Sequence, residues 1–356
     1  MTCLQTPKRS INSKTRLKPR FLLQWHLTER CNLRCKHCYQ NLDYLGKEIS
    51  EREKKDIIKR FIKFCKKLNR VPRLAFTGGE PLLVIDELDR LIEYGKEICP
   101  ELQVVIMTNG TLVDEYLSFF ERWQPLYVQV SLDGADAETH EGIRGRGTFA
   151  RTLGAIRALT ELGIPVAVMS VFHKDNERTL LDLVDLCHSL KVSRLGVTAL
   201  VPEGAGAKMS DKLLSPEEVH QLFLKLVQKQ SELEKKGSSL IIDMRRPLWV
   251  LVKDEAEKLN VSAEVGGSCA AGFSCLALLP NGDVMPCRRM NVVIGNLVKQ
   301  NFFEIWYGSN LLNDLREKSA VECSSCEFLR SCGGCKAVSK AVNGSFFVRD
   351  PLCWKQ

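Results

Sequence analysis

The sequence lacks any long hydrophobic run. No apolar stretch approaches the roughly 20 residues that a transmembrane helix needs. The apolar segment from Phe21 to Leu27 is too short and too polar for the hydrophobic region of a secretory signal peptide. These two absences argue against a membrane protein and a secreted one, so we predict a cytoplasmic protein with no membrane partner.

Acidic residues are missing from the first 20 positions. The basic residues there are Lys8, Arg9, Lys14, Arg16, Lys18 and Arg20. Because the net charge of the whole 356-residue chain is only +8, we interpret residues 1–20 as a solvated, flexible arm and predict no nucleic-acid partner. A docking arm for an acidic peptide is the alternative.

Cysteine, in contrast, is abundant. The chain has 15 cysteines and no signal peptide, which argues against a disulfide framework, because cytosolic thiols stay reduced and clustered thiols bind metal. Three lie close together after Leu27, and eight follow Gly266. Ordinary packing explains most of the other four, which are Cys3, Cys65, Cys99 and Cys187, and we assign them no function.

Short apolar runs alternate with amphipathic segments from Phe21 to about Leu200. The runs predict six strands and read FLLQWHL, RLAFT, QVVIMT, LYVQVSL, PVAVMSV and RLGVTAL. Between them, apolar residues recur at about 3.6-residue spacing, which predicts helices. The alternation predicts an α/β fold with a parallel sheet covered by helices, either doubly wound or an incomplete barrel. In both folds, chemistry is expected in loops beyond the carboxyl ends of the strands.

The segment LTERCNLRCKHCYQ directly follows the first predicted strand. It places Cys31, Cys35 and Cys38 in a C-x3-C-x2-C array. Three thiolates so close in sequence can hold three irons of a 4Fe–4S cubane and leave the fourth iron open. A structural zinc site is the alternative, but His37 is poorly spaced as a fourth ligand, and such sites usually combine two separated pairs.

This array, followed by the aromatic Tyr39, resembles the signature of the radical S-adenosylmethionine (SAM) superfamily. The second predicted strand runs into Thr77-Gly78-Gly79-Glu80-Pro81, which resembles the family's GGEP loop. Its glycines permit close backbone approach. By this resemblance we expect Glu80 to accept a hydrogen bond from the amino group of SAM.

Two further strand ends and one arginine extend the resemblance. The third predicted strand ends at Thr108-Asn109-Gly110 and the fourth at Ser131-Leu132-Asp133-Gly134. The family implies that Asn109 and Ser131 hydrogen-bond the ribose or carboxylate of SAM. Arg144, in THEGIRGRGTF, resembles the family arginine that pairs with the SAM carboxylate, a role that suits the guanidinium fork.

The resemblance covers roughly residues 20 to 200 and implies a partial (β/α)6 barrel similar to a TIM barrel. It implies an enzyme in which an electron from a reduced cluster breaks the sulfonium C–S bond of SAM. Methionine and a 5′-deoxyadenosyl radical result, and the radical takes a hydrogen atom from a substrate. The barrel must keep this radical from solvent, and a donor such as flavodoxin or ferredoxin must reduce the cluster.

The last eight cysteines resemble the SPASM extension, which holds two auxiliary 4Fe–4S clusters. By position, the resemblance assigns Cys269, Cys275, Cys287 and Cys335 to the first cluster, and Cys323, Cys326, Cys332 and Cys353 to the second. The family usually has three residues before the last cysteine of the quartet. Here only Gly333 and Gly334 intervene, which leaves the role of Cys335 open. Two structural zinc sites of four thiolates each are the alternative.

The composition of the chain changes along its length. At 356 residues and 44% hydrophobic content, the chain is long enough for one large domain and a smaller one. The predicted segments are a basic arm at 1–20, a radical SAM core barrel at 21–214, a helical linker at 215–265 and a SPASM domain at 266–356.

Enzymes with this extension mostly modify ribosomally made peptides or proteins, for example by thioether or carbon–carbon cross-links. We therefore predict a peptide maturase. Arg288 stands where sulfatase-maturing members carry an aspartate, which disfavours formylglycine chemistry. Only about 20 residues precede the first predicted strand, and we expect no room there for the winged-helix leader-binding domain of many maturases.

Two other functions stay open. A second branch of the superfamily remodels acidic side chains of tetrapyrroles, and Arg245, Arg246, Arg288 and Arg289 suit propionates equally well. Outside enzymes, the alternative is an electron-transfer or zinc-stabilised binding module. Such a module needs neither an open-iron triplet nor a GGEP loop, so SAM binding discriminates between the two classes.

Overall fold

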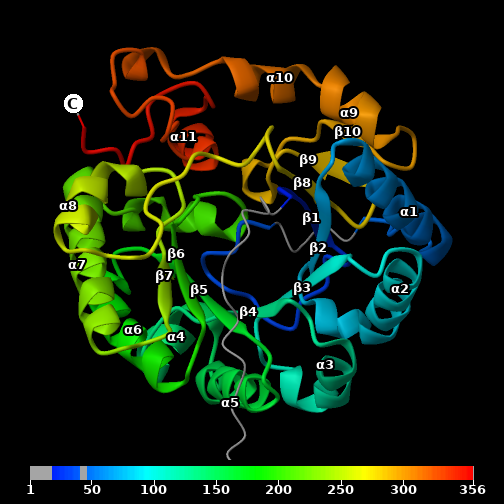
Figure 1. The fold of residues 1–356 in the computed structure, drawn as a ribbon, viewed down its shortest axis with the longest axis horizontal. Helices are drawn as coiled ribbons and strands as arrows, with labels where there is room; N and C mark the ends of the chain where they lie inside the picture. Colours follow the sequence, from blue (N-terminus) through cyan, green and yellow to red (C-terminus); the bar gives the residue numbers. More distant parts are fainter. Residues whose placement is uncertain (1–17, 41–45, 356) are drawn as a thin grey trace, which may run out of the picture.

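The computed structural model describes residues 18–40 and 46–355, so most of the predicted basic arm lies outside the described residues. Within them, seven parallel strands curve into an open barrel (Figure 1). They are β1 (Arg20–His26), β2 (Val71–Thr77), β3 (Gln103–Thr108), β4 (Tyr127–Ser131), β5 (Val166–Phe172), β6 (Arg194–Ala199) and β7 (Ile241–Asp243). The first six coincide with the six predicted strands, so the predicted partial barrel is confirmed.

Helices follow the strands and cover the outside of the barrel (Figure 1). They are α1 (Glu51–Lys67), α2 (Ile85–Ile98), α3 (Leu117–Trp123), α4 (Ala137–Arg144), α5 (Thr148–Glu161), α6 (Leu180–Ser189), α7 (Pro216–Lys235) and α8 (Lys253–Lys258). None of the helices in the described ranges is both long enough and apolar enough to cross a bilayer.

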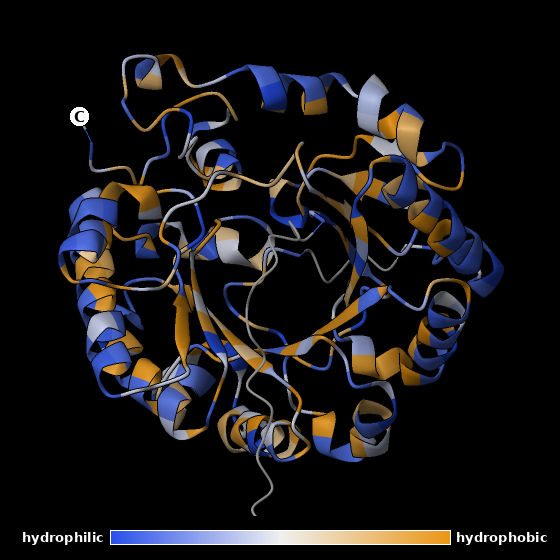
Figure 2. Cartoon of the chain, viewed as in Figure 1, coloured by the Kyte–Doolittle hydropathy of each residue, from blue (hydrophilic) through white to orange (hydrophobic). Residues whose placement is uncertain are grey.

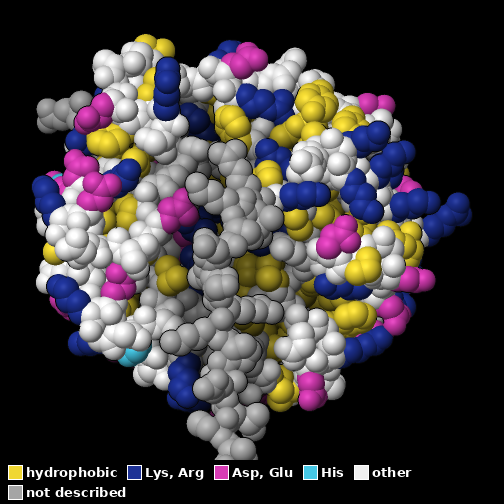
Figure 3. All heavy atoms as spheres, viewed as in Figure 1, with side chains coloured by type: hydrophobic (Ala, Val, Ile, Leu, Met, Phe, Trp, Pro, Cys, Tyr) yellow, Lys and Arg dark blue, Asp and Glu magenta, His cyan; other side chains and the backbone are white. Residues whose placement is uncertain are grey.

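Helix α1 illustrates why these segments form and how they pack. Ser50 accepts a hydrogen bond from the Glu53 backbone, and the Glu53 carboxylate accepts one from the Ser50 backbone, which forms a capping box. Ile58 and Phe61 on one side of the helix are buried. Apolar residues of the outer helices face the strands (Figure 2), whereas Lys and Arg side chains gather on the α1 side of the surface (Figure 3).

The C-terminal unit continues the barrel sheet past β1. Strand β8 (Cys275–Leu278) pairs in parallel with β1, and β9 (Asp283–Met285) and β10 (Gly295–Asn296) follow as antiparallel neighbours. At the other edge, β7 pairs with β6 although it lies in the predicted helical linker. The predicted domain boundaries therefore stay predictions, because one hydrogen-bonded sheet crosses them.

Aromatic side chains join the C-terminal unit to the barrel. Its helices are α9 (Phe302–Gly308), α10 (Asn310–Glu317) and α11 (Lys336–Asn343). The ring of Phe302 stacks 5.4 Å from Phe64 on α1, and Trp306 lies 4.9 Å from Phe21 on β1. Arg60 also donates hydrogen bonds to the carbonyls of Leu297 and Gln300. These contacts hold the cysteine-rich unit beside the mouth of the barrel.

Candidate functional site

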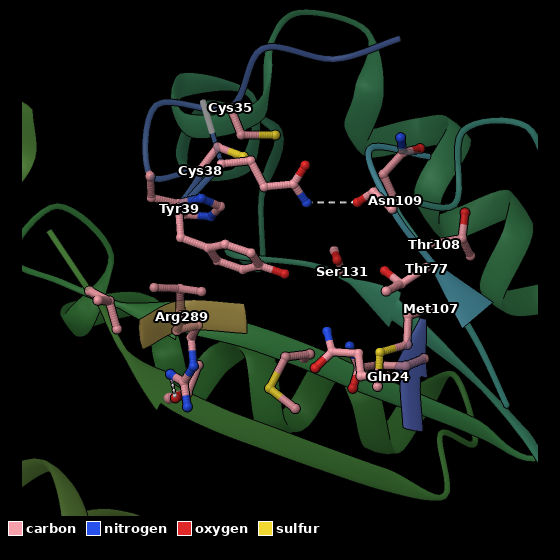
Figure 4. A pocket seen from close by; sticks show the side chains of 18 of the residues that line it. Gln24, Cys35, Cys38, Tyr39, Thr77, Met107, Thr108, Asn109, Ser131 and Arg289 are labelled. Atoms are coloured by element: carbon pink, nitrogen blue, oxygen red, sulfur yellow. Dashed lines mark hydrogen bonds between the residues drawn. The ribbon is translucent and has the colours of Figure 1, made fainter. Parts of the chain in front are cut away.

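A cavity of about 420 Å³ occupies the inside of the barrel. Its lining combines the triplet loop, the glycines after β2, the ends of β3 and β4, and two residues of the C-terminal unit, Cys287 and Arg289. Figure 4 shows Cys35 and Cys38 at one end of this cavity and Arg289 on the far side of Tyr39. No Asp or Glu side chain is among the described residues that line it.

All three triplet thiols line the cavity. Burial raises the pKa of Cys31 to about 11 and also raises the pKa of Cys35 and Cys38. The thiols are therefore neutral until a cation displaces their protons. Three soft sulfur donors beside a cavity without carboxylates fit an iron–sulfur cluster.

The glycines after β2 pack against the segment that leads into the triplet. The backbone N–H of Gly79 donates to the Thr28 carbonyl at 2.8 Å, and the N–H of Glu80 donates to the Arg30 carbonyl at 2.8 Å. A Cβ at position 79 would lie 2.0 Å from the Arg30 carbonyl oxygen. Only glycine fits this approach, which brings the backbone of Gly78 and Gly79 into the lining.

Glu80 lies behind that lining and not in it. Its side chain is fully buried and accepts hydrogen bonds from the Thr108 hydroxyl at 2.7 Å, the Asn109 backbone at 2.8 Å and the Leu82 backbone at 3.2 Å. Burial raises the pKa of Glu80 to about 7. The carboxylate joins the β2 and β3 loops, and the expected contact of Glu80 with the amino group of SAM stays a prediction.

Asn109 and Ser131 line the cavity at the ends of β3 and β4. The Asn109 amide nitrogen donates to the Asn32 side chain at 2.9 Å, and its oxygen accepts from the Thr111 backbone at 2.8 Å. Asn32 lies inside the triplet, so Asn109 also holds the triplet loop in position.

Arg144 is bound to a carboxylate that the sequence analysis did not single out. Its Nε donates to Asp133 at 2.6 Å, and His37 Nε2 lies 2.7 Å from the same oxygen. Burial raises the pKa of Asp133, but Arg144 and His37 outweigh it and hold that pKa well below its usual range. The Nη1 of Arg144 points toward Cys35 Sγ at 3.7 Å. Asp133 lies at the end of the predicted fourth strand, and this position is the only feature of the sequence that could have marked it as a site residue.

Tyr39 lines the cavity between the two cysteine-rich parts of the chain. The guanidinium of Arg288 lies 5.6 Å from the centre of its ring. Burial raises the pKa of Tyr39. The ring therefore packs under a C-terminal arginine while its other surface faces the cavity.

The C-terminal cysteines gather in two sets. Burial raises the pKa of Cys269 to about 12, and the next largest contributions come from Cys335 and Cys287. Burial also raises the pKa of Cys275, and the next largest contributions come from Cys287 and Cys269. The second set lines one small cavity and comprises Cys323, Cys326, Cys332 and Cys353.

Cys335 reaches the first set despite its short spacing from Cys332. Gly333 and Gly334 both have positive φ, 68° and 63°, a conformation that glycine adopts freely. The backbone N–H of Cys335 then donates to Asp350 at 2.7 Å. The turn and this hydrogen bond together direct Cys335 toward Cys287.

Thiol spacing bears on the zinc alternative. Across residues 18–40 and 46–355, no group of three or more His, Cys, Asp or Glu side chains is close enough together to hold a single metal ion. In a 4Fe–4S cubane each cysteine binds a different iron, so the thiols stand further apart than around one zinc ion. Four thiol donors in each C-terminal set are sufficient for a 4Fe–4S cluster.

Comparison with family models gives two matches. The model of the radical SAM superfamily matches residues 25–187. The model of SPASM, an iron–sulfur cluster-binding domain, matches residues 269–335.

Named relatives match over nearly the whole chain. The AdoMet-dependent heme synthase of Methanosarcina barkeri is 29% identical over 93% of this chain and 95% of that protein. The Fe-coproporphyrin III synthase of the same organism is 31% identical over 93% of this chain and 86% of that protein. The mycofactocin maturase MftC of Mycobacterium tuberculosis is 30% identical over 93% of this chain and 82% of that protein.

Solved structures share the fold at lower identity. SuiB of Streptococcus suis bound to S-adenosylmethionine gives a TM-score of 0.74 at 18% identity and covers 95% of this chain and 78% of that one. The enzyme anSMEcpe with bound AdoMet and a Kp18Cys peptide gives a TM-score of 0.74 at 20% identity and covers 94% of each chain.

Proposed function

Because the chain belongs to the radical SAM superfamily and carries a SPASM domain, we propose that it cleaves SAM reductively and removes a hydrogen atom from an acidic substrate. Enzymes of this kind contain a SAM-binding 4Fe–4S cluster and auxiliary clusters. The observation that carries the proposal is one cavity lined by Cys31, Cys35, Cys38 and the glycine loop, with no carboxylate among its described residues.

In this proposal Cys31, Cys35 and Cys38 hold the SAM-binding cluster. When bound, that cluster supplies the electron that breaks the C–S bond of SAM. The backbone of Gly78 and Gly79 offers polar groups to SAM, and Arg144 offers its remaining N–H groups to an anion near Cys35. The surrounding barrel excludes water from the reacting groups.

The two C-terminal sets of cysteines hold the auxiliary clusters in this proposal. Cys269, Cys275, Cys287 and Cys335 bind the one that adjoins the cavity through Cys287. The other four bind the second. Four thiolates for each cluster leave no iron open, which favours electron transfer over direct binding of a substrate thiolate.

Two substrate classes have specific support. The full-length similarity to an AdoMet-dependent heme synthase, together with three arginines and no carboxylate in the lining, supports a tetrapyrrole with carboxylate side chains as the first candidate. The similarity to a mycofactocin maturase supports a peptide, which the sequence analysis favoured, as the second. A reductant is required with either substrate.

The test of the proposed function replaces Cys31, Cys35 and Cys38 with alanine in anaerobically prepared protein. We expect iron to fall from about 12 to about eight per chain and dithionite-dependent formation of 5′-deoxyadenosine to disappear. The control is Cys187→Ala, which changes a buried thiol on α6 and is expected to keep both. Retained SAM cleavage in the triple variant would contradict the proposal.

A further inference from the structure

Four arginines occur as two adjacent pairs in the C-terminal half of the chain. Arg245 and Arg246 follow β7, and Arg288 and Arg289 follow Cys287. In each pair the two side chains have the same chemistry, so the sequence does not tell them apart. Their contacts in the structure do.

One member of each pair already has a carboxylate partner outside the cavity lining. Arg245 Nε lies 3.0 Å from Asp243, and Arg288 Nη2 lies 3.7 Å from Glu29. Neither arginine lines the cavity. Each of these two guanidinium groups therefore has a carboxylate partner within the protein, although Arg288 Nε has no hydrogen-bond partner among the described residues.

The other members, Arg246 and Arg289, both line the cavity. In the described part of the chain, neither forms an ion pair with a carboxylate. Arg289 donates to the Thr198 hydroxyl at 2.8 Å, and Arg246 donates to the thioether of Met169 at 3.8 Å. Both of these acceptors are neutral. Arg289 also lies near the Cys287 and Cys335 thiols, which raise its pKa, but neither is a carboxylate.

Arg246 is the more poorly satisfied of the two. Its Nε is buried and has no hydrogen-bond partner among the described residues. Gly196 on β6 allows Met169 and Arg246 to pack against the strand, since a Cβ there would lie 2.6 Å from the Met169 methyl and 3.7 Å from Arg246 Nη2. Burial, followed by the positive charge of Arg289, holds the pKa of Arg246 below its usual range. A buried guanidinium in this state is stabilised by an anion.

We propose that Arg246 and Arg289 form a carboxylate-binding site for the substrate, in the wall of the cavity that the triplet cysteines also line. This inference rests on the proposed function and names the substrate chemistry it requires. A substrate carboxylate held here would keep the rest of the molecule inside the barrel. The carboxylate can belong to a propionate of a tetrapyrrole or to an acidic peptide.

The test measures binding to holoenzyme in the absence of reductant, so it remains readable even if radical chemistry fails. The first probe is iron coproporphyrin III, with its tetramethyl ester as the carboxylate-free comparison. The second is a peptide of six glutamates, with the corresponding glutamine peptide as its comparison. The variants are Arg246→Gln and Arg246→Lys, with Arg245→Gln as the matched control because Arg245 pairs with Asp243 outside the cavity lining.

We expect one free acid to bind tightly and its neutral counterpart weakly. Arg246→Gln should weaken binding of that acid by about tenfold or more, Arg246→Lys should restore part of the affinity, and Arg245→Gln should change it less than about twofold. Binding of the porphyrin identifies a tetrapyrrole as the source of the carboxylate, and binding of the peptide identifies a peptide.

Three results would overturn the proposal. The first is equal binding of the acids and their neutral counterparts by the wild-type enzyme, including no binding of either. The second is unchanged affinity in Arg246→Gln. The third is loss of iron or an altered electron paramagnetic resonance spectrum of the auxiliary clusters in Arg246→Gln, which would show that this arginine serves Cys335 and its cluster.

Discussion

Asp133 is the residue on which the buried polar contacts of the site converge. Its carboxylate accepts hydrogen bonds from Arg144 and from the Val171 backbone and lies 2.7 Å from His37, while its own N–H donates to His140 Nδ1 at 3.2 Å. A buried carboxylate is tolerated only with such partners. Asp133 therefore fixes the Arg144 guanidinium beside Cys35.

His140 makes the stability of this network depend on pH. Burial and the nearby Arg144 lower the pKa of His140 from 6.5 to about 4. Between these values the unfolded chain binds a proton that the folded chain does not, so the unfolding free energy falls as pH falls from 6.5 to 4. The loss is about 3 kcal/mol at most.

The variant His140→Asn keeps an acceptor near Asp133 N–H and removes the titration. We expect its urea midpoint, measured anaerobically from pH 4.5 to 7.5, to change less with pH than that of the wild type. We expect cluster loss in acid to affect both proteins equally. Parallel pH profiles would mean that His140 is not the titrating group.

At the scale of elements, the loop after β2 is held by backbone contacts together with the Glu80 carboxylate. Gly79 and Glu80 bond to the carbonyls of Thr28 and Arg30, and the Glu80 carboxylate bonds to the end of β3. Hydrogen bonds thereby link three loops into one unit. The site that the proposed function assigns to SAM depends on this backbone approach.

Replacing Gly79 with alanine should displace that unit. The new Cβ would lie 2.0 Å from the Arg30 carbonyl oxygen, so we expect a stability loss of about 1–3 kcal/mol and weaker SAM binding by equilibrium dialysis. Gly308→Ala on α9 is the control, since a Cβ there meets nothing within 4 Å. Equal SAM affinity in both variants would contradict the close packing of this loop.

At the scale of the whole molecule, one sheet of order β10-β9-β8-β1-β2-β3-β4-β5-β6-β7 runs through the barrel and the cysteine-rich unit. The edge of β1 that would otherwise lie open is covered by β8. Aromatic contacts around Phe21 and Phe64 seal the same junction. We therefore expect the two parts to unfold together.

Trp306→Ala tests this coupling. The indole is 6% exposed, and the guanidinium of Arg316 lies 4.4 Å from its ring. We expect a loss of about 3–5 kcal/mol, with coincident urea transitions by far-UV circular dichroism and by visible absorption of the clusters. Tyr307→Ala, at a side chain that is 58% exposed, should have little effect. Separate transitions in the wild type would refute a single cooperative unit.

Long patterns in the sequence predicted most of the fold. Each of β1–β6 carries a run of apolar residues, and the intervening helices show an apolar face, so their existence and order follow from local chemistry. Strands β7 and β8 have only three and four residues, too few to show a pattern. Their pairing with β6 and β1 depends on contacts between distant parts of the chain.

The sequence by itself determined the cysteine triplet, the glycine loop and the strand ends beside them, because these motifs are local and their chemistry depends on residue type. The division of the last eight cysteines into two sets came from the family resemblance. Tertiary structure alone decided which polar side chains face the cavity. Glu80 lies behind the lining because neighbouring loops satisfy its carboxylate. Arg246 lines the cavity, whereas Arg245 pairs with Asp243 outside the lining.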